Sequence, residues 1–360
     1  MKWTSNAWVS GAKGLAIGFA GGLLGAAAHI PVPWLIGPLV AVAASRFAGA
    51  DVSALPGGRQ AGQWIIGTAL GLYFTPEVAA LVARLWWLLL IGAVFALALG
   101  YLSGYLLHAL TRVDKTTAVF ASVPGGAAEM SVLGERYGAR VDVVAAAQSL
   151  RIALVVLTIP ALFAAFGLHG ADAFRPGTSD VRLLGLVTLL GATLLGGLFF
   201  ARVGLPNAFI LGALAVAIPL TVADVNLSAV PRPLSNAAQL LLGCALGARF
   251  ERGFMRQAPR VAGAVVASVA LAMVLSALLA WAMAVATKLN VATLILATAP
   301  GGIAEMAITA KVLELGVPLV TAFHVTRLVI LLTCTGPLFA SLRRYRAARR
   351  ARLNPRGPVA

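Results

Sequence analysis

The stretch SVPGGAAEM at residues 122–130 decides the fold, because it returns as TAPGGIAEM at residues 298–306, a shift of 176 residues. The same shift carries Arg151 to Arg327. Further pairs at this shift, or at one residue less, are Gln63 and Gln239, Gln148 and His324, Gly67 and Gly243, and Trp34 and Phe209. Self-similarity at a fixed shift indicates a duplication, which here spans nearly the whole chain.

The composition is that of a membrane protein. Hydrophobic residues make up 60% of the chain and charged residues 11%, with a mean hydropathy of +0.92. Soluble domains carry about 25% charged residues. The net charge of +16 could indicate nucleic acid or a membrane surface. Because most of the excess lies between apolar segments and in the C-terminal tail, we predict an all-α integral membrane protein with the bilayer, and no nucleic acid, as partner.

Each half reads as the same series of six apolar segments, most of which approach the roughly 20 residues that a spanning helix needs. The predicted segments are 14–31, 33–50, 60–74, 81–108, 117–134 and 143–166, then 183–201, 206–222, 236–248, 261–286, 293–310 and 317–340. The predicted domains are a first membrane repeat at 1–170, a linker at 171–182, a second membrane repeat at 183–342 and a basic cytoplasmic tail at 343–360.

The Pro-Gly-Gly triplets should interrupt their segments. Proline lacks the N–H that a continuous helix needs, and glycine disfavours the helix. At membrane depth, a broken backbone survives only where it is buried in protein or lines a wet cavity. We therefore expect a re-entrant hairpin or a discontinuous helix at each triplet.

The distribution of arginine favours two inverted halves. Seven arginines lie between Arg343 and Arg356, after the last segment, whereas the equivalent point of the first half has no positive excess. The loop from Arg249 to Arg260 holds four arginines, and its first-half equivalent is not basic. Positive loops are cytoplasmic. We predict an inverted 5+5 arrangement of spans with a cytoplasmic C-terminus; a parallel 6+6 arrangement is the alternative.

Two acids and two arginines lie well inside apolar segments: Glu129, Glu305, Arg151 and Arg327. Ionisable groups in a membrane are candidates for function. The alternative is that Glu129 pairs with Arg151 and Glu305 with Arg327 for structure only, since buried charges are normally paired. An arginine also suits a carboxylate-bearing substrate, because it can donate two parallel hydrogen bonds.

The glycines of both triplets would leave backbone N–H groups free at a broken point, where secondary transporters bind substrate and coupling ion. A tight turn with close packing is the alternative. His324, which replaces Gln148 across the repeat, would relay protons or be a hydrogen-bonded interior histidine. The predicted substrate- and ion-binding residues are Pro124, Gly125, Gly126, Glu129, Gln148, Arg151, Pro300, Gly301, Gly302, Glu305, His324 and Arg327.

Other residues that the two halves have in common are predicted to have structural roles. Gln63 and Gln239 each lead into a Gly-xxx-Gly pair, which favours close helix packing over a binding role. Asp114 and Asn290 are expected to cap the segments that follow them. The four histidines are scattered, and no metal-binding, nucleophile or phosphate-loop motif occurs. We therefore expect no cofactor, no metal, no catalytic residue and no ATP-driven transport.

The tandem Pro-Gly-Gly-x-Ala-Glu-Met blocks, with Arg151 and Arg327 downstream, resemble the AbrB family of bacterial membrane proteins over residues 14–340. That family carries a duplicated membrane module of this length. Its members carry two conflicting labels, ammonia monooxygenase and transcriptional regulator. The resemblance implies a multi-pass protein of the bacterial cytoplasmic (inner) membrane. The 5+5 plan with broken segments is also similar to ion-coupled transporters of the sodium–proton antiporter and glutamate or citrate symporter type.

These observations predict ion- or proton-coupled secondary transport of a small solute, which the arginines suggest is anionic. The alternative is a non-transporting membrane regulator of gene expression that acts through a partner at its basic face. A membrane-bound enzyme such as a monooxygenase ranks third. The sequence leaves open which solute and ion are bound and whether the protein is a homodimer.

Overall fold

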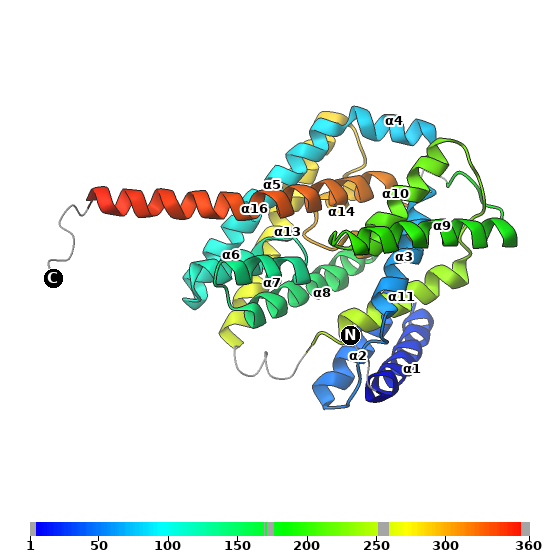
Figure 1. Ribbon diagram of the computed structural model, residues 1–360, viewed down its shortest axis with the longest axis horizontal. Coiled ribbons are helices and arrows are strands. Elements are labelled where there is room, and N and C mark those ends of the chain that lie inside the picture. The colour runs from blue at the N-terminus through cyan, green and yellow to red at the C-terminus, as the bar shows by residue number, and fades with distance from the viewer. Residues whose placement is uncertain (1–4, 169, 171–175, 251–258, 354–360) are drawn as a thin grey trace.

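The computed structural model describes residues 5–168, 170, 176–250 and 259–353, and all regular structure in this part of the chain is α-helical (Figure 1). The helices of the first half are α1 (Ser5–Ala27), α2 (Pro33–Ala48), α3 (Gly58–Gly71), α4 (Pro76–Arg84), α5 (Trp86–Thr111), α6 (Lys115–Ser122), α7 (Ala127–Arg136) and α8 (Val141–Ala165). Those of the second half are α9 (Leu183–Arg202), α10 (Ala208–Val222), α11 (Arg232–Gly247), α13 (Pro259–Thr287), α14 (Val291–Thr298), α15 (Ile303–Val312) and α16 (Val317–Leu353).

Within the described residues, six helices are long and apolar enough to cross a membrane: α1, α5, α8, α9, α13 and α16. A seventh span results if α3 and α4, which meet at a bend of 94°, count as one. Helices α2 and α10 are apolar but shorter. The all-helical, multi-pass class is therefore confirmed, and the ten-span inverted topology stays a prediction.

Both Pro-Gly-Gly triplets interrupt a helix, as expected. Helix α6 ends at Ser122 and α7 begins at Ala127, while α14 ends at Thr298 and α15 begins at Ile303. Asp114 caps α6 by accepting a hydrogen bond from Thr117 N, and Asn290 caps α14 by accepting one from Thr293 N. Both predicted caps are confirmed. The last helix runs beyond the predicted segment, because α16 continues to Leu353 and projects away from the other helices (Figure 1).

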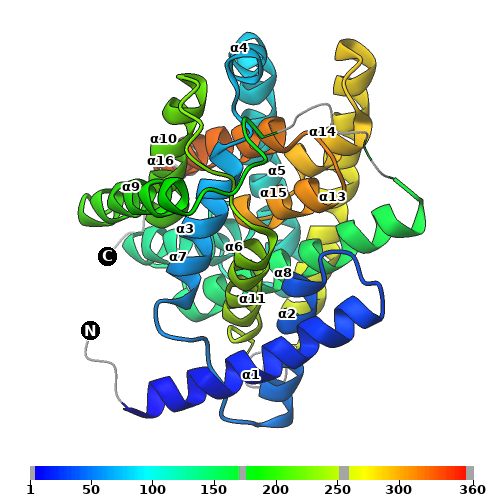
Figure 2. The same ribbon diagram turned by 90° about the vertical axis from the view of Figure 1, so that its right-hand side faces the viewer.

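The two halves interleave rather than packing as separate bodies. Helix α3 of the first half lies against α9 and α10, and α11 of the second half lies against α1 and α2 (Figure 2). The Gly-xxx-Gly pairs form these contacts. A Cβ at Gly67 would lie 2.8 Å from the carbonyl oxygen of Ile210, and a Cβ at Gly243 would collide with that of Leu35. Close packing by these glycines, which lets helix backbones approach each other, is confirmed.

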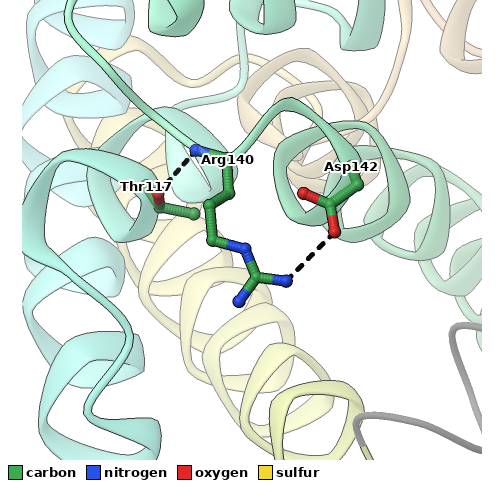
Figure 3. Close-up of polar contacts among 3 residues, drawn as sticks. All are labelled: Thr117, Arg140 and Asp142. Atoms are coloured by element: carbon green, nitrogen blue, oxygen red, sulfur yellow. Dashed lines mark hydrogen bonds and ion pairs between the residues drawn. The ribbon is translucent and has the colours of Figure 1, made fainter.

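The remaining helices hold the two breaks in the middle of the molecule. Helix α5 contacts both α13 and α16, and α8 contacts α13 (Figure 1, Figure 2). The turn that joins α7 to α8 is tied back to α6, because Arg140 N donates to Thr117 Oγ1 at 2.9 Å (Figure 3). In the second half, Gly316 N donates to Thr293 Oγ1 at 3.1 Å. Among the described residues, only the first of these turns carries an ion pair, between Arg140 and Asp142 at 3.1 Å (Figure 3).

Candidate functional site

The two glycines of each triplet leave room for side chains of the following helix turn. A Cβ at Gly125 would collide with Met130, and one at Gly301 would lie 2.6 Å from Met306 Cγ. A Cβ at either second glycine, Gly126 or Gly302, would meet the carboxylate of the glutamate three residues later. The Pro-Gly-Gly-x-Ala-Glu-Met pattern therefore has a physical cause: the methionine covers the first glycine and the glutamate covers the second.

The buried arginines bind the backbone carbonyls that each break leaves without helical partners. Arg151 Nη1 donates to the carbonyl oxygen of Val123 at 3.3 Å. Arg327 Nη1 donates to Ala299 O at 2.6 Å, and its Nη2 donates to Gly301 O. The two arginines are only 4% and 5% exposed. Since carbonyls at a helix end need other donors, the arginines stabilise the broken backbone.

Gln148 and His324 bind further backbone carbonyls at the breaks. Both side chains are fully buried. Gln148 Nε2 donates to Phe120 O at 2.8 Å and to Val123 O at 2.7 Å. His324 Nε2 lies 3.0 Å from Leu296 O. The two side chains thus bind carbonyls at equivalent positions of the two halves. This geometry agrees with the alternative that His324 is a hydrogen-bonded interior histidine.

The two breaks meet at one polar cavity of about 70 Å³. Of the predicted binding residues, it is lined by Pro124, Gly126, Arg151, Gly301, Gly302, Glu305 and Arg327. Pro300 lies in an adjoining hollow that Pro124 and Arg151 also line. Gly125, Glu129, Gln148 and His324 are outside the cavity lining. The structure therefore brings seven of the twelve predicted residues to one cavity, and their role in binding stays a prediction.

Neither predicted glutamate–arginine ion pair forms within 4.0 Å among the described residues. Glu129 Oε1 instead accepts a hydrogen bond from Asn207 Nδ2 at 3.3 Å, and its buried Oε2 has no partner in this part of the chain. The structural alternative of two simple ion pairs is thus wrong for this conformation. The reason is that the carbonyls freed by each break lie closer to the guanidinium groups.

Asn207 is the centre of a polar cluster that the sequence reasoning missed. Its Oδ1 accepts hydrogen bonds from Arg59 Nη2 at 3.2 Å and from Gln63 Nε2 at 3.1 Å. Asn207 is the N-cap of α10 and has a left-handed backbone with φ of 48°. Asparagine tolerates this conformation better than most residues. A Pro-Asn pair directly before an apolar segment was the signal available in the sequence.

Arg249 is the second residue that sequence reasoning did not assign to the site, since it belongs to a basic loop that indicates topology. It lines the cavity together with Arg59. Burial, and next the positive charge of Arg59, lower the pKa of Arg249 to about 10, while Glu305 and Glu129 oppose this change. Arg249 therefore stays protonated at neutral pH. The cavity lining holds four guanidinium groups and one carboxylate, that of Glu305.

Comparison with known proteins places the chain in a family. Residues 34–343 match the family described as "Transition state regulatory protein AbrB". The chain belongs to the AbrB family. One relative of the chain is the "Uncharacterized protein YhjN" of Bacillus subtilis (strain 168), 26% identical over 358 residues, with 91% of this chain and 92% of the relative covered.

A second relative is similar at the same level. It is the "Putative regulator AbrB" of Escherichia coli (strain K12), 25% identical over 329 residues, with 91% of this chain and 92% of the relative covered. No solved structure matches the chain. The AbrB matches thus agree with the resemblance that the tandem Pro-Gly-Gly blocks indicate.

Proposed function

We propose that this AbrB-family protein is a secondary transporter of a small anionic solute, driven by a proton or cation. The observation that carries the proposal is the cavity where both helix breaks meet and where four arginines face one carboxylate. Such a surplus of positive charge at a buried site needs an anion to balance it. Broken helices at a repeat interface are where secondary transporters bind substrate and coupling ion.

The first turns of α7 and α15 support an anionic substrate. Gly126 and Ala127 of one break, and Gly302 and Ile303 of the other, line the cavity. Helix N-termini carry partial positive charge and free N–H groups, which favour bound anions. At about 70 Å³, the cavity has room for a few water molecules, since one water needs about 10–15 Å³ on this measure. A solute of a few non-hydrogen atoms, such as a small carboxylate, fits this chemistry.

Glu305 is the group that would accept the coupling proton or cation. Its side chain lines the cavity, and no described side chain forms a hydrogen bond with its carboxylate. Glu129, by contrast, is held by Asn207 at the edge of the site. Protonation or cation binding at Glu305 would change the charge of the cavity by one unit, and would thereby link ion binding to anion binding.

The inverted arrangement of the two halves is part of the proposal, because alternating access commonly uses such repeats. The uneven charge of equivalent loops and the multi-pass helices support a bacterial cytoplasmic membrane location with the C-terminus inside. Single cysteines at Ser179 and Ser341, in a chain without its native cysteines, give a direct test with impermeant thiol reagents. Labelling from opposite sides is expected, and labelling from the same side would contradict inversion.

The transport experiment uses purified protein in liposomes, with a panel of radiolabelled small carboxylates and an imposed pH or sodium gradient. Glu305→Gln should lower gradient-driven uptake by more than about tenfold, which corresponds to a loss of about 1.4 kcal/mol. Glu129→Gln should lower it less. Glu314→Gln, outside the cavity, is the control.

A membrane regulator is the second candidate function, because one relative carries the name of a regulator. A regulator predicts a partner that co-purifies with the protein from its native membrane and no flux of any solute in the panel. It also predicts that solute uptake into proteoliposomes equals that of empty vesicles, both for the unsubstituted protein and for Glu305→Gln. Flux that depends on Glu305 would exclude a purely regulatory role.

A further inference from the structure

A large hollow of the described residues is a groove between α5, α6 and α16, which we call the first groove. It has a volume of about 700 Å³ and lies away from the polar cavity. Apolar side chains such as Val94, Leu97 and Leu338 line most of it. Tyr101 Oη donates to Thr335 O at 3.0 Å, which fixes α5 against α16 beneath the groove. The groove is therefore a built feature between fixed helices.

The polar residues of the first groove are concentrated at one end. Helix α5 reaches His108 there, α6 begins with Lys115 and Thr116, and α16 contributes Arg343. Lys115 and Arg343 are both exposed. Arg343 is also the first of the arginines that follow the last span. This end therefore presents cationic groups and a hydroxyl donor to a ligand whose other end lies among apolar side chains.

A second groove occupies the place that the repeat makes equivalent, between α8 of the first half and α13 and α14 of the second. Leu162 and Phe163 take the places of Leu338 and Phe339, and Ile295 takes that of Val119, each at the shift of 176 residues. Its volume is about 430 Å³, and its lining contains no charged residue. Val291 and Gly167 stand at the positions equivalent to Lys115 and Arg343. The grooves therefore share several equivalent lining positions and differ in volume and charge.

We propose that the first groove is a binding site for an anionic phospholipid. One or more acyl chains lie along the apolar part between α5 and α16, and the phosphate group binds to Lys115 and Arg343. The charge of the site complements an anionic headgroup, and basic pockets between membrane helices at the cytoplasmic side bind such lipids. The second groove can accept acyl chains but has no cation for a headgroup. It therefore provides an internal control.

The test measures binding of phosphatidylglycerol and of phosphatidylcholine to the full chain in detergent by native mass spectrometry, with thermal stability measured in parallel. Tighter binding of phosphatidylglycerol is expected. Lys115→Gln combined with Arg343→Gln should weaken phosphatidylglycerol binding by about tenfold or more and leave phosphatidylcholine unchanged. Arg136→Gln combined with Arg344→Gln removes the same charge outside the groove, and should have little effect.

A second pair of variants tests the apolar part of the site. Ala98 and Ala270 are exposed residues that line the first and the second groove, respectively. Ala98→Trp should abolish the preference for phosphatidylglycerol by filling the groove, and Ala270→Trp should retain it. Equal binding of the two lipids, or equal loss in both charge variants, would overturn the proposal. So would a change from dimer to monomer in Ala98→Trp without lipid, since a second copy would then occupy the groove.

Discussion

The break at Pro124 and the break at Pro300 have nearly the same sequence but hold their charged groups differently. In the second, Arg327 donates to two carbonyl oxygens, and Glu305 faces the cavity without a hydrogen-bonded side chain. In the first, Arg151 donates to one carbonyl oxygen, and Glu129 is bound by Asn207. When Gln148 and His324 are included, side chains make three hydrogen bonds to the backbone at each break. The breaks therefore differ in how many of these bonds the arginine makes and in the carboxylate, which is freer in the second.

This difference shows how two similar sequences acquire two roles. The residues of the Pro-Gly-Gly blocks determine the break itself and are nearly the same in both halves. The residue that reaches the glutamate comes from elsewhere in the chain. Asn207 has Val32 as its counterpart at the start of α2, also with a left-handed backbone, and valine cannot form the same bonds. The asymmetry at the glutamates therefore follows from one polar residue placed in only one half.

The largest difference is expected at the two arginines. Arg327→Gln should destabilise the protein by about 3–6 kcal/mol and Arg151→Gln by about 1.5–3 kcal/mol, because charge-assisted hydrogen bonds contribute about 1.5–3 kcal/mol each. Thermal unfolding in detergent would rank the two variants. Arg151→Lys and Arg327→Lys, which keep the charge, serve as controls. A larger loss for Arg151→Gln would reverse the comparison.

The second glycines should differ next. Gly126 has φ of +98°, whereas Gly302 has φ of −88°, a value open to any residue. Alanine displaces the glutamate carboxylate at both positions but is strained only at the first. Gly126→Ala should therefore lose about 1–3 kcal/mol more stability than Gly302→Ala. The same thermal measurement tests this, and equal losses would show that crowding, rather than backbone conformation, decides both.

The contact between Glu129 and Asn207 should give a smaller, pair-specific effect. A double-mutant cycle with Glu129→Ala and Asn207→Ala should yield a coupling of about 0.5–1.5 kcal/mol, the usual contribution of one hydrogen bond. The matched cycle of Glu305→Ala with Asn207→Ala should yield a coupling near zero. Similar couplings in the two cycles would mean that Asn207 does not distinguish the halves.

The smallest effect is expected at the ion pair between Arg140 and Asp142, in the turn between α7 and α8. Among the described residues, the equivalent turn of the second half has no ion pair. Arg140 and Asp142 side chains are 64% and 71% exposed (Figure 3). Exposed pairs contribute below about 1 kcal/mol and are screened by salt. Asp142→Asn should therefore change the unfolding midpoint only slightly, and less at high salt. A large loss would indicate that this turn is held by more than the bond from Arg140 N to Thr117.

The sequence by itself determined the features that depend on neighbouring residues. The Pro-Gly-Gly triplets at Pro124 and Pro300 interrupt helices because a residue without an N–H stands directly before two residues that disfavour the helix. Asp114 and Asn290 cap the helices that begin beside them, and the Gly-xxx-Gly pairs allow close packing. The class of membrane protein followed from composition and from apolar segments of sufficient length. These properties are set within one or two helical turns, so the sequence displays them directly.

Only the tertiary structure decided which groups surround the buried charges. The sequence suggested that each glutamate pairs with the arginine of its own half. In the structure the arginines donate hydrogen bonds to backbone carbonyls instead, and Glu129 accepts one from Asn207, which is 78 residues away. Arg59 and Arg249 complete the cavity from two further segments. A buried charge binds the strongest partner within a few ångströms, and that partner depends on how the interleaved helices meet. Sequence spacing carries no record of those distances.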